Sequence, residues 1–178
     1  MDKLRAAFRT AVDALVRRKQ DEEYLPTDDD WTVIKRDISV LANAAFPKEA
    51  CGFVLVSGSS GFTDWSGVHH PGPFYTQEVD NVADWPYAQF RIRDVDAQLA
   101  LSSGRCIAVW HSHPEEAAVP SEMDAELAVP KLYFVIYAVQ GEDLAVFLDE
   151  DGQLVPQVIV MPADDQVELE VREDGGIS

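Results

Sequence analysis

The 178-residue sequence is poor in the residues on which several classes of protein depend. It has two cysteines, Cys51 and Cys106, both inside hydrophobic segments typical of strands. They make no disulfide framework, and because neither has a second cysteine at ligand spacing, we do not expect a thiolate metal site. No apolar run approaches the roughly 20 residues needed to cross a bilayer, and the first 20 residues lack a signal-peptide pattern. We therefore expect a cytoplasmic protein without membrane contact.

Basic residues are also scarce. There are 14 Lys and Arg against 32 Asp and Glu, for a net charge of −18. Six of the basic residues fall within residues 1–20, so the remainder of the chain is strongly acidic. An acidic surface repels phosphate backbones, so we expect no nucleic acid partner. The charge fits a basic protein partner, and it equally fits a role in solubility alone.

The sequence predicts three parts. Residues 1–30 form an amphipathic helix and an acidic linker, because apolar residues recur at helical spacing and the stretch 20–30 is charged and contains Pro26. Residues 31–162 form one domain, and 163–178 form an acidic tail. The apolar stripe of the helix consists of Leu4, Phe8, Val12 and Leu15.

Within the domain the pattern predicts alternating helices and strands, hence an α/β fold. Hydrophobic runs bounded by turn residues predict strands, and apolar residues three and four apart predict helices. The expected elements are a helix at 37–45, a strand at 51–57 with a hairpin partner at 62–69, a long loop at 71–88, a brief strand at 90–93 running into a helix at 93–103, a strand at 106–110, and three strands within 132–161.

The segment HSHPEEAAVPSEMD carries the clearest chemical signal. His111 and His113 are two of only four histidines, and at i and i+2 of a strand their side chains leave the same face. Ser121 can cap a helix whose first turn carries Asp124. Two imidazoles and a carboxylate predict one catalytic zinc ion per chain, with water as the open fourth ligand. Ser121 and Asp124 also fit a plain capping pair, and the two roles can coexist.

A metal-activated water needs a general base, which spacing alone cannot select among 32 acidic residues. Glu49 has a favourable setting between a helix end and a strand. Glu115 and Glu116 directly follow the histidines, yet their position predicts solvated side chains. His69 and His70 stand beside a Pro/Gly loop and are expected at the surface.

Together these residues resemble a known family. HSHP, six residues and then Ser121-x-x-Asp124, with an upstream PKEACGFVL that carries Glu49, resemble the JAMM (MPN+) zinc metalloprotease signature. The segment NVADWPYAQFRI resembles the bacterial and phage branch of the family, and the resemblance covers about residues 31–148.

The resemblance implies zinc bound by His111, His113 and Asp124, Glu49 as acid and base, and Ser121 as a donor to the oxyanion. It also implies a curved mixed β-sheet flanked by helices, with cytidine-deaminase-like layering. The implied reaction is hydrolysis after the C-terminal glycine of a ubiquitin-like modifier, in a bacterial conjugation or antiphage defence operon. The N-terminal helix would then contact enzymes of that pathway.

Three alternatives stay open. The same chemistry could process a linear precursor. The chain could instead be a phage tail assembly protein with a structural or maturation-protease role, although scaffold versions of this fold generally lack the metal ligands. The pair Gly175-Gly176 suggests a modifier, but two glycines in an acidic tail are also common in disordered ends. For a substrate tail, the aromatic residues at 71–90 are candidate walls or simply pack under their own loop: Phe74, Tyr75, Trp85 and Tyr87.

Overall fold

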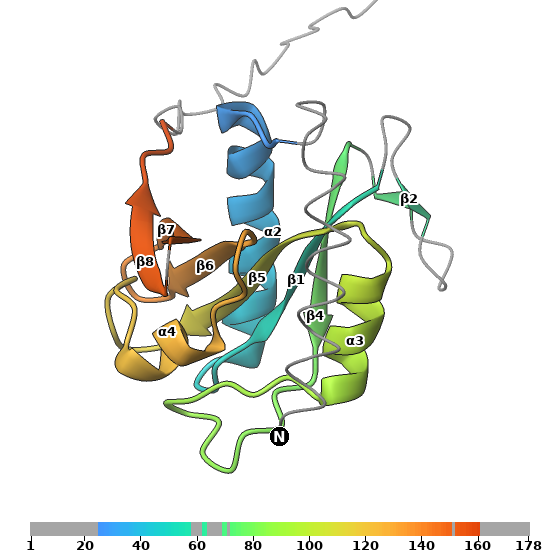
Figure 1. Cartoon of the computed structure of the whole chain (residues 1–178). Coiled ribbons are helices and arrows are strands. Elements are labelled where there is room, and N and C mark those ends of the chain that lie inside the picture. The colour runs from blue at the N-terminus through green and yellow to red at the C-terminus, as the bar shows by residue number, and fades with distance from the viewer. Residues whose placement is uncertain (1–24, 58–61, 64–68, 71, 151, 161–178) are drawn as a thin grey trace, which may run out of the picture.

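The computed structural model describes residues 25–57, 62–63, 69–70, 72–150 and 152–160 (Figure 1). The predicted N-terminal helix, the tail at 163–178 and Gly175-Gly176 lie outside these ranges. Within them, no helix combines the length and the apolar character that a membrane crossing requires.

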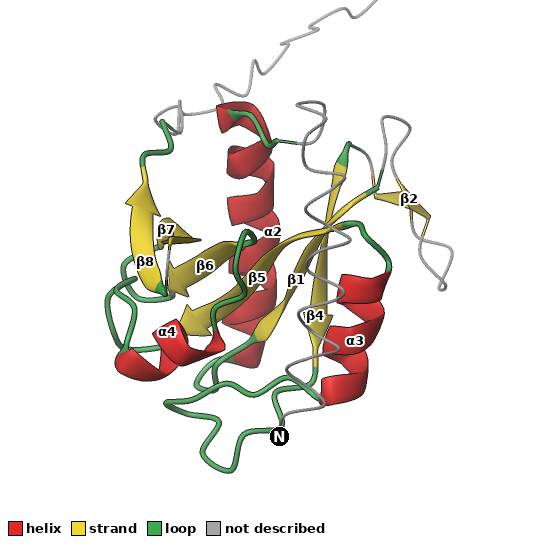
Figure 2. Cartoon of the chain, viewed as in Figure 1, coloured by secondary structure: helices red, strands yellow, loops and turns green. Residues whose placement is uncertain are grey.

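A six-stranded open sheet forms the centre of the fold (Figure 2). The strands run in the order β4-β1-β5-β6-β7-β8, and β5 and β6 are parallel whereas all other neighbours are antiparallel. This confirms the predicted mixed sheet flanked by helices. The strands are β1 (Cys51–Val56), β4 (Phe74–Val79), β5 (Cys106–His113), β6 (Tyr133–Ala138), β7 (Asp143–Glu150) and β8 (Gln153–Gln157).

Helices cover both faces of this sheet (Figures 1 and 2). Helix α2 (Asp28–Ala45) packs on one face, and its buried residues share a core with Trp110 of β5 and Val135 of β6. Helices α3 (Asp94–Ser102) and α4 (Glu122–Leu127) lie over the other face. There a second core joins Leu101 of α3 to Phe53 of β1 and Phe134 of β6.

Helix α2 is longer than the sequence pattern predicted. It begins at Asp28, so residues 28–30, which were assigned to the linker, form its first turn. Thr27 and Asp30 make a reciprocal capping box, and three aspartates favour the positive end of the helix dipole. The three aspartates at 28–30, which were assigned to the linker, therefore start a helix. The face that packs on the sheet consists of Trp31, Ile34, Ile38 and Ala42.

The partner predicted for β1 was wrong. Of residues 62–69, the structure describes β2 (Phe62–Thr63) and the start of β3 (His69–His70), and these two strands pair with each other. The partner is β4, which lies inside the predicted loop at 71–88. The prolines at 71 and 73 favoured a loop in the sequence-based prediction. They precede β4, however, and so remove none of its ladder hydrogen bonds. The brief strand expected at 90–93 is also absent, since those residues lie in the connection to α3.

Gly52 of β1 lets a side chain cross the sheet. It pairs with Trp110 on one side and with Glu78 on the other. The indole of Trp110 passes over it and donates a hydrogen bond of 3.2 Å to the Gln77 carbonyl oxygen of β4. A Cβ at position 52 would overlap that oxygen and lie 2.8 Å from the indole nitrogen. This hydrogen bond thus joins β5 to β4 across β1, at the position where β1 has no side chain.

Gly52→Ala should therefore lower the free energy of unfolding by about 3 kcal/mol, the upper end of the range for overpacking. Gly141→Ala is the matched control, because the nearest atoms to its added Cβ are 3.9 Å away. Urea unfolding of both variants checks this. Equal stabilities of the two variants would contradict the crossing.

Candidate metal centre

Two histidines stand at the carboxyl end of β5. The strand is buried along its whole length, and its odd-numbered residues from 109 face the α3 and α4 layer. His111 and His113 therefore point the same way, as their spacing predicted, and their Nε2 atoms lie 3.0 Å apart. Ser112 faces the opposite side, where its hydroxyl oxygen accepts a hydrogen bond from the Ala50 amide at 2.9 Å.

Asp124 arrives from the connection between β5 and β6. Ser121 is the N-cap of α4, and its hydroxyl accepts from the Asp124 amide while the Asp124 carboxylate accepts from the Ser121 amide. The Ser121 hydroxyl also donates to Asp124 Oδ2 at 2.7 Å. The capping pair and the predicted ligand are therefore the same residues. To donate to an oxyanion, this hydroxyl would have to leave Asp124.

The three side chains have the geometry of a metal site. Asp124 Oδ1 lies 3.2 Å from His111 Nε2, and Asp124 Oδ2 lies 3.7 Å from His113 Nε2. A tetrahedral ion with bonds of about 2.0–2.1 Å separates its ligand atoms by about 3.3 Å. The three ligand atoms all lie within 4.8 Å of one another. The cluster is therefore compatible with a small divalent cation.

Surrounding groups fix the rings. His113 Nδ1 lies 2.7 Å from the Ala117 carbonyl oxygen, which can only accept a hydrogen bond. Nδ1 therefore carries the proton and donates, and in the neutral ring Nε2 keeps its lone pair for a metal. His111 Nδ1 has no hydrogen-bond partner among the described residues. The ring of His111 is instead stacked on Phe90, with centroids 4.3 Å apart, and tilted against Phe134 at 5.3 Å. Aromatic packing thus orients His111, and a hydrogen bond orients His113.

Burial and proximity shift the ionisation of the ligands. Burial lowers the pKa of His111, which favours the neutral imidazole that a metal requires. Burial also opposes ionisation of Asp124, but its interactions with the adjacent imidazoles of His111 and His113 outweigh burial and hold the pKa of that carboxyl well below its ordinary value. The metal-free site thus presents the ionised carboxylate of Asp124 beside the neutral imidazole of His111.

Glu49 reaches the cluster through the pairing of β1 with β5. Cys51 is opposite His111, and the bonds between residues 50 and 112 continue this antiparallel register outward. Two residues before Cys51, Glu49 therefore stands at the level of His113. Only 6% of Glu49 is exposed. Burial raises its pKa to about 7, the charge of His113 opposes the rise, and the charges of Asp124 and Glu116 add to it. A carboxylate with a pKa near neutrality suits proton transfer.

The loop between β4 and α3 supplies residues that the sequence did not single out. The Pro86 carbonyl accepts from the Glu49 amide at 2.7 Å, and Asn81 Nδ2 donates to the Glu49 carbonyl at 2.9 Å. Phe90, which covers His111, comes from the same loop. Asn81 and Phe90 both lie in NVADWPYAQFRI, so the resemblance marked their segment but assigned them no role.

The aromatic residues proposed as a wall divide into two groups. Phe74 and Tyr75 belong to β4 and not to a loop. Trp85 and Tyr87 do lie in the loop, 62% and 50% exposed, with ring centroids 6.0 Å apart. They flank Pro86, whose carbonyl contacts Glu49. Of His69 and His70, the structure describes only the backbone pairing in β3.

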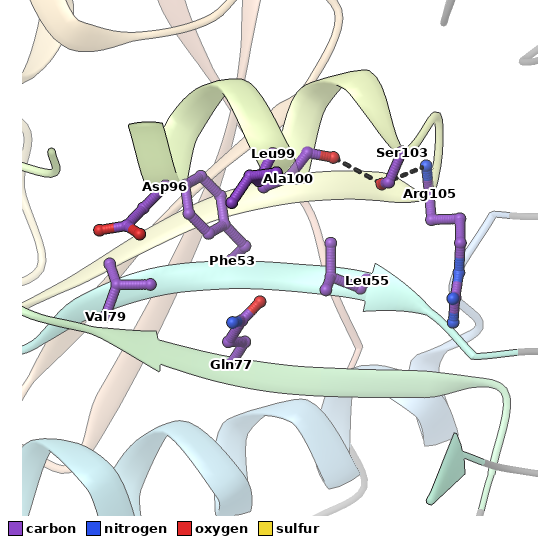
Figure 3. A pocket seen from close by; sticks show the side chains of 9 residues that line it. All are labelled: Phe53, Leu55, Gln77, Val79, Asp96, Leu99, Ala100, Ser103 and Arg105. Carbon is purple, nitrogen blue, oxygen red and sulfur yellow. Dashed lines mark hydrogen bonds between the residues drawn. The ribbon is translucent and has the colours of Figure 1, made fainter. Parts of the chain in front are cut away.

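A separate groove lies between α3 and strands β1 and β4 (Figure 3). Phe53 and Leu55 form one wall, and α3 forms the other. Ser103 closes its end by donating to the Ala100 carbonyl and accepting from the Arg105 amide. None of the three candidate ligands lines this groove, and neither does Glu49. It is therefore distinct from the metal centre.

Comparisons with known proteins identify the family of the chain. The family described as prokaryotic homologs of the JAB domain matches residues 33–149, and the chain therefore belongs to that family. This confirms the resemblance to the JAMM/MPN signature. Many members of the JAB/MPN family are hydrolases.

Two solved structures resemble the chain. A protein from Desulfitobacterium hafniense is 24% identical, with a TM-score of 0.49, and the match covers 71% of this chain and 87% of that one. A protein from Salinibacter ruber is 20% identical, with a TM-score of 0.44, and the match covers 74% and 90% of the two chains. A search of curated proteins gave no match.

Removing one candidate ligand should weaken metal binding without unfolding the protein. Asp124→Asn keeps the size of the side chain but removes its charge, so affinity for zinc should fall at least about 100-fold. Titration calorimetry on metal-free protein measures this. Glu122→Gln, on the same turn of α4 but exposed, should bind as the wild type does. Equal affinity in both variants would contradict the site.

Stability should depend on pH through Glu49. In the metal-free protein, its pKa is raised from 4.5 to about 7. Between these values the unfolded chain releases the proton and the folded protein retains it, so stability falls as pH rises through this window. Glu49→Gln should therefore be more stable than the wild type by about 3 kcal/mol above pH 7, with the advantage vanishing near pH 4.

Urea unfolding of metal-free protein at several pH values provides the measurement. Glu126→Gln, exposed on α4, should show no such trend relative to the wild type. A stability difference between Glu49→Gln and the wild type that stays constant with pH would refute the buried-carboxyl account.

Proposed function

We propose that this protein is a zinc-dependent peptidase that hydrolyses the bond after the C-terminal glycine of a ubiquitin-like protein. The observation that carries the proposal is the placement of a buried glutamate with a pKa of about 7 beside three converging metal ligands. The ligand set also favours zinc, because two imidazoles and one carboxylate are the donors of several catalytic zinc sites.

His111, His113 and Asp124 would hold the ion. When bound there, zinc would polarise a carbonyl group and acidify a water molecule. Glu49 accepts a proton from the attacking water at a carboxylate oxygen as the new C–O bond forms. It returns that proton to the departing amine as the C–N bond breaks, so no net proton is consumed in the exchange. In this proposal Ser121 turns its hydroxyl from Asp124 Oδ2 to the oxyanion.

The surroundings of Glu49 support a peptide substrate. Trp85 and Tyr87 are exposed on either side of Pro86, which touches the Glu49 backbone. Exposed aromatic side chains beside a reactive group provide apolar contact area for an extended chain. The acidic surface would attract a basic partner. A lysine-linked conjugate and a linear precursor both present the C-terminal tail of the ubiquitin-like protein as an extended chain. The chemistry at the carbonyl carbon is the same in both.

Glu49→Gln should keep zinc but lower kcat/KM by about 10²- to 10⁴-fold, because the amide cannot accept the proton. The substrates are a lysine-linked ubiquitin conjugate and a linear fusion to the ubiquitin C-terminus, with cleavage followed by mass spectrometry. Glu115→Gln, exposed near the histidines, is the control and should retain activity.

An active Glu49→Gln would refute the assigned base. Cleavage of only the linear fusion would support precursor processing over deconjugation. A zinc-loaded wild type that cleaves neither substrate would count against this substrate class.

A further inference from the structure

One side chain makes four hydrogen bonds that join the loop between β4 and α3 to Glu49. Asn81 uses all four of its hydrogen-bonding positions. Its Nδ2 donates to the carbonyl oxygens of Glu49 and Gln89, both at 2.9 Å. Its Oδ1 accepts from the amides of Ala83 at 3.1 Å and Arg91 at 3.0 Å. The side chain thus joins both ends of the loop to the segment that carries the proposed base.

We propose that Asn81 is a positioning residue that holds Glu49 at the metal centre. The inference rests on the proposed peptidase function, since it assigns Asn81 a part in the placement of the base. Asn81 itself touches neither the candidate ligands nor the carboxylate of Glu49 in the hydrogen bonds that the described residues make.

The backbone of Glu49 is held on both sides of its Cα. Its amide donates to Pro86 at 2.7 Å, and its carbonyl accepts from Asn81. The amide belongs to the peptide plane before the Cα and the carbonyl to the plane after it, so both rotations about the Cα are fixed. The direction of the Cα–Cβ bond follows from those rotations. Asn81 therefore helps to set the direction in which the Glu49 side chain leaves the backbone.

The peptide plane after Glu49 is also held from β5, because it contains the Ala50 amide. The Ala50 amide donates to the Ser112 hydroxyl, and the Ser112 amide donates to the Ala50 carbonyl. Ser112 stands between the two histidine ligands in the strand. The loop side and the strand side thus hold Glu49 relative to the cluster from opposite directions, and Asn81 provides the loop side.

The same loop also orients a ligand. Phe90 follows Gln89, whose carbonyl accepts from Asn81, and precedes Arg91, whose amide donates to it. Phe90 is buried and stacks on His111. Anchoring the backbone on both sides of Phe90 places the ring against the imidazole. One asparagine therefore connects the position of the base with that of a metal ligand.

A simpler role for Asn81 explains only one of its contacts. Asparagine often accepts a hydrogen bond from the amide two residues later in a turn, and the bond from Ala83 is of this kind. The bond to Glu49 spans 32 residues, and the bonds to Gln89 and Arg91 span eight and ten. A turn alone does not require these three.

Two variants test the proposal. Asn81→Ala removes all four bonds, and Asn81→Asp keeps the two accepted ones but cannot donate to Glu49. Asn43→Ala and Asn43→Asp are matched controls, because Asn43 donates to the Ser39 carbonyl on the exposed face of α2. If Asn81→Ala does not fold, Asn81→Asp carries the test.

The first measurement needs no substrate. Amide hydrogen exchange of the zinc-loaded protein should be faster at Glu49 by roughly 3- to 10-fold in both Asn81 variants. The amide of Val146 in β7 and both Asn43 variants should match the wild type. An unchanged Glu49 amide in the Asn81 variants would overturn the proposal.

The second measurement separates positioning from general support. Against the substrate cleaved best by the wild type, kcat should fall by about 10- to 100-fold, with KM and zinc content unchanged. Loss of zinc in parallel with kcat, or a kcat equal to that of the wild type, would overturn the proposed role. If the wild type cleaves nothing, the peptidase function fails, and the exchange result still decides whether Asn81 holds Glu49.

Discussion

The arrangement of the site depends on the two different pairings of β5. This buried strand is antiparallel to β1 and parallel to β6. Antiparallel pairing brings the start of β1, and with it Glu49, to the end of β5 where His113 stands. Parallel pairing forces the chain to cross back over the sheet before β6 begins, and that crossover carries α4 and Asp124 over the same strand end. Three segments that are distant in the sequence meet at the carboxyl end of β5, because its two neighbouring strands run in opposite directions.

The sequence predicted those parts of the site that are encoded locally. The i, i+2 spacing of His111 and His113 and the cap pattern of Ser121 and Asp124 each need only a few neighbouring residues to be recognised. Glu49 was selected by its setting and by the family signature, since a single glutamate carries no periodic signal. The mixed sheet was expected from the same resemblance. The strongest predictions therefore concern short segments with one dominant geometry.

The remaining features depend on contacts between distant residues. Asn81 lies 32 residues from Glu49, and no spacing rule connects them. Phe90 becomes part of the site only because its loop closes over β5. Strand β4 was missed because prolines precede it, and its identity as the partner of β1 depends on tertiary pairing. The start of α2 at Asp28 was missed because acidic residues suit both a linker and the first turn of a helix.

The helix cap at Ser121 has a consequence for metal binding at the candidate site. Asp124 is fixed by the Ser121 amide and hydroxyl through bonds that belong to the fold and not to an ion. The side-chain entropy of this carboxylate is therefore lost when the protein folds, and not when a metal binds. Small zinc domains that collapse without their ion gain their order from it. The described fold thus places the Asp124 carboxylate without an ion, so any metal bound by this cluster would not be needed to order that ligand.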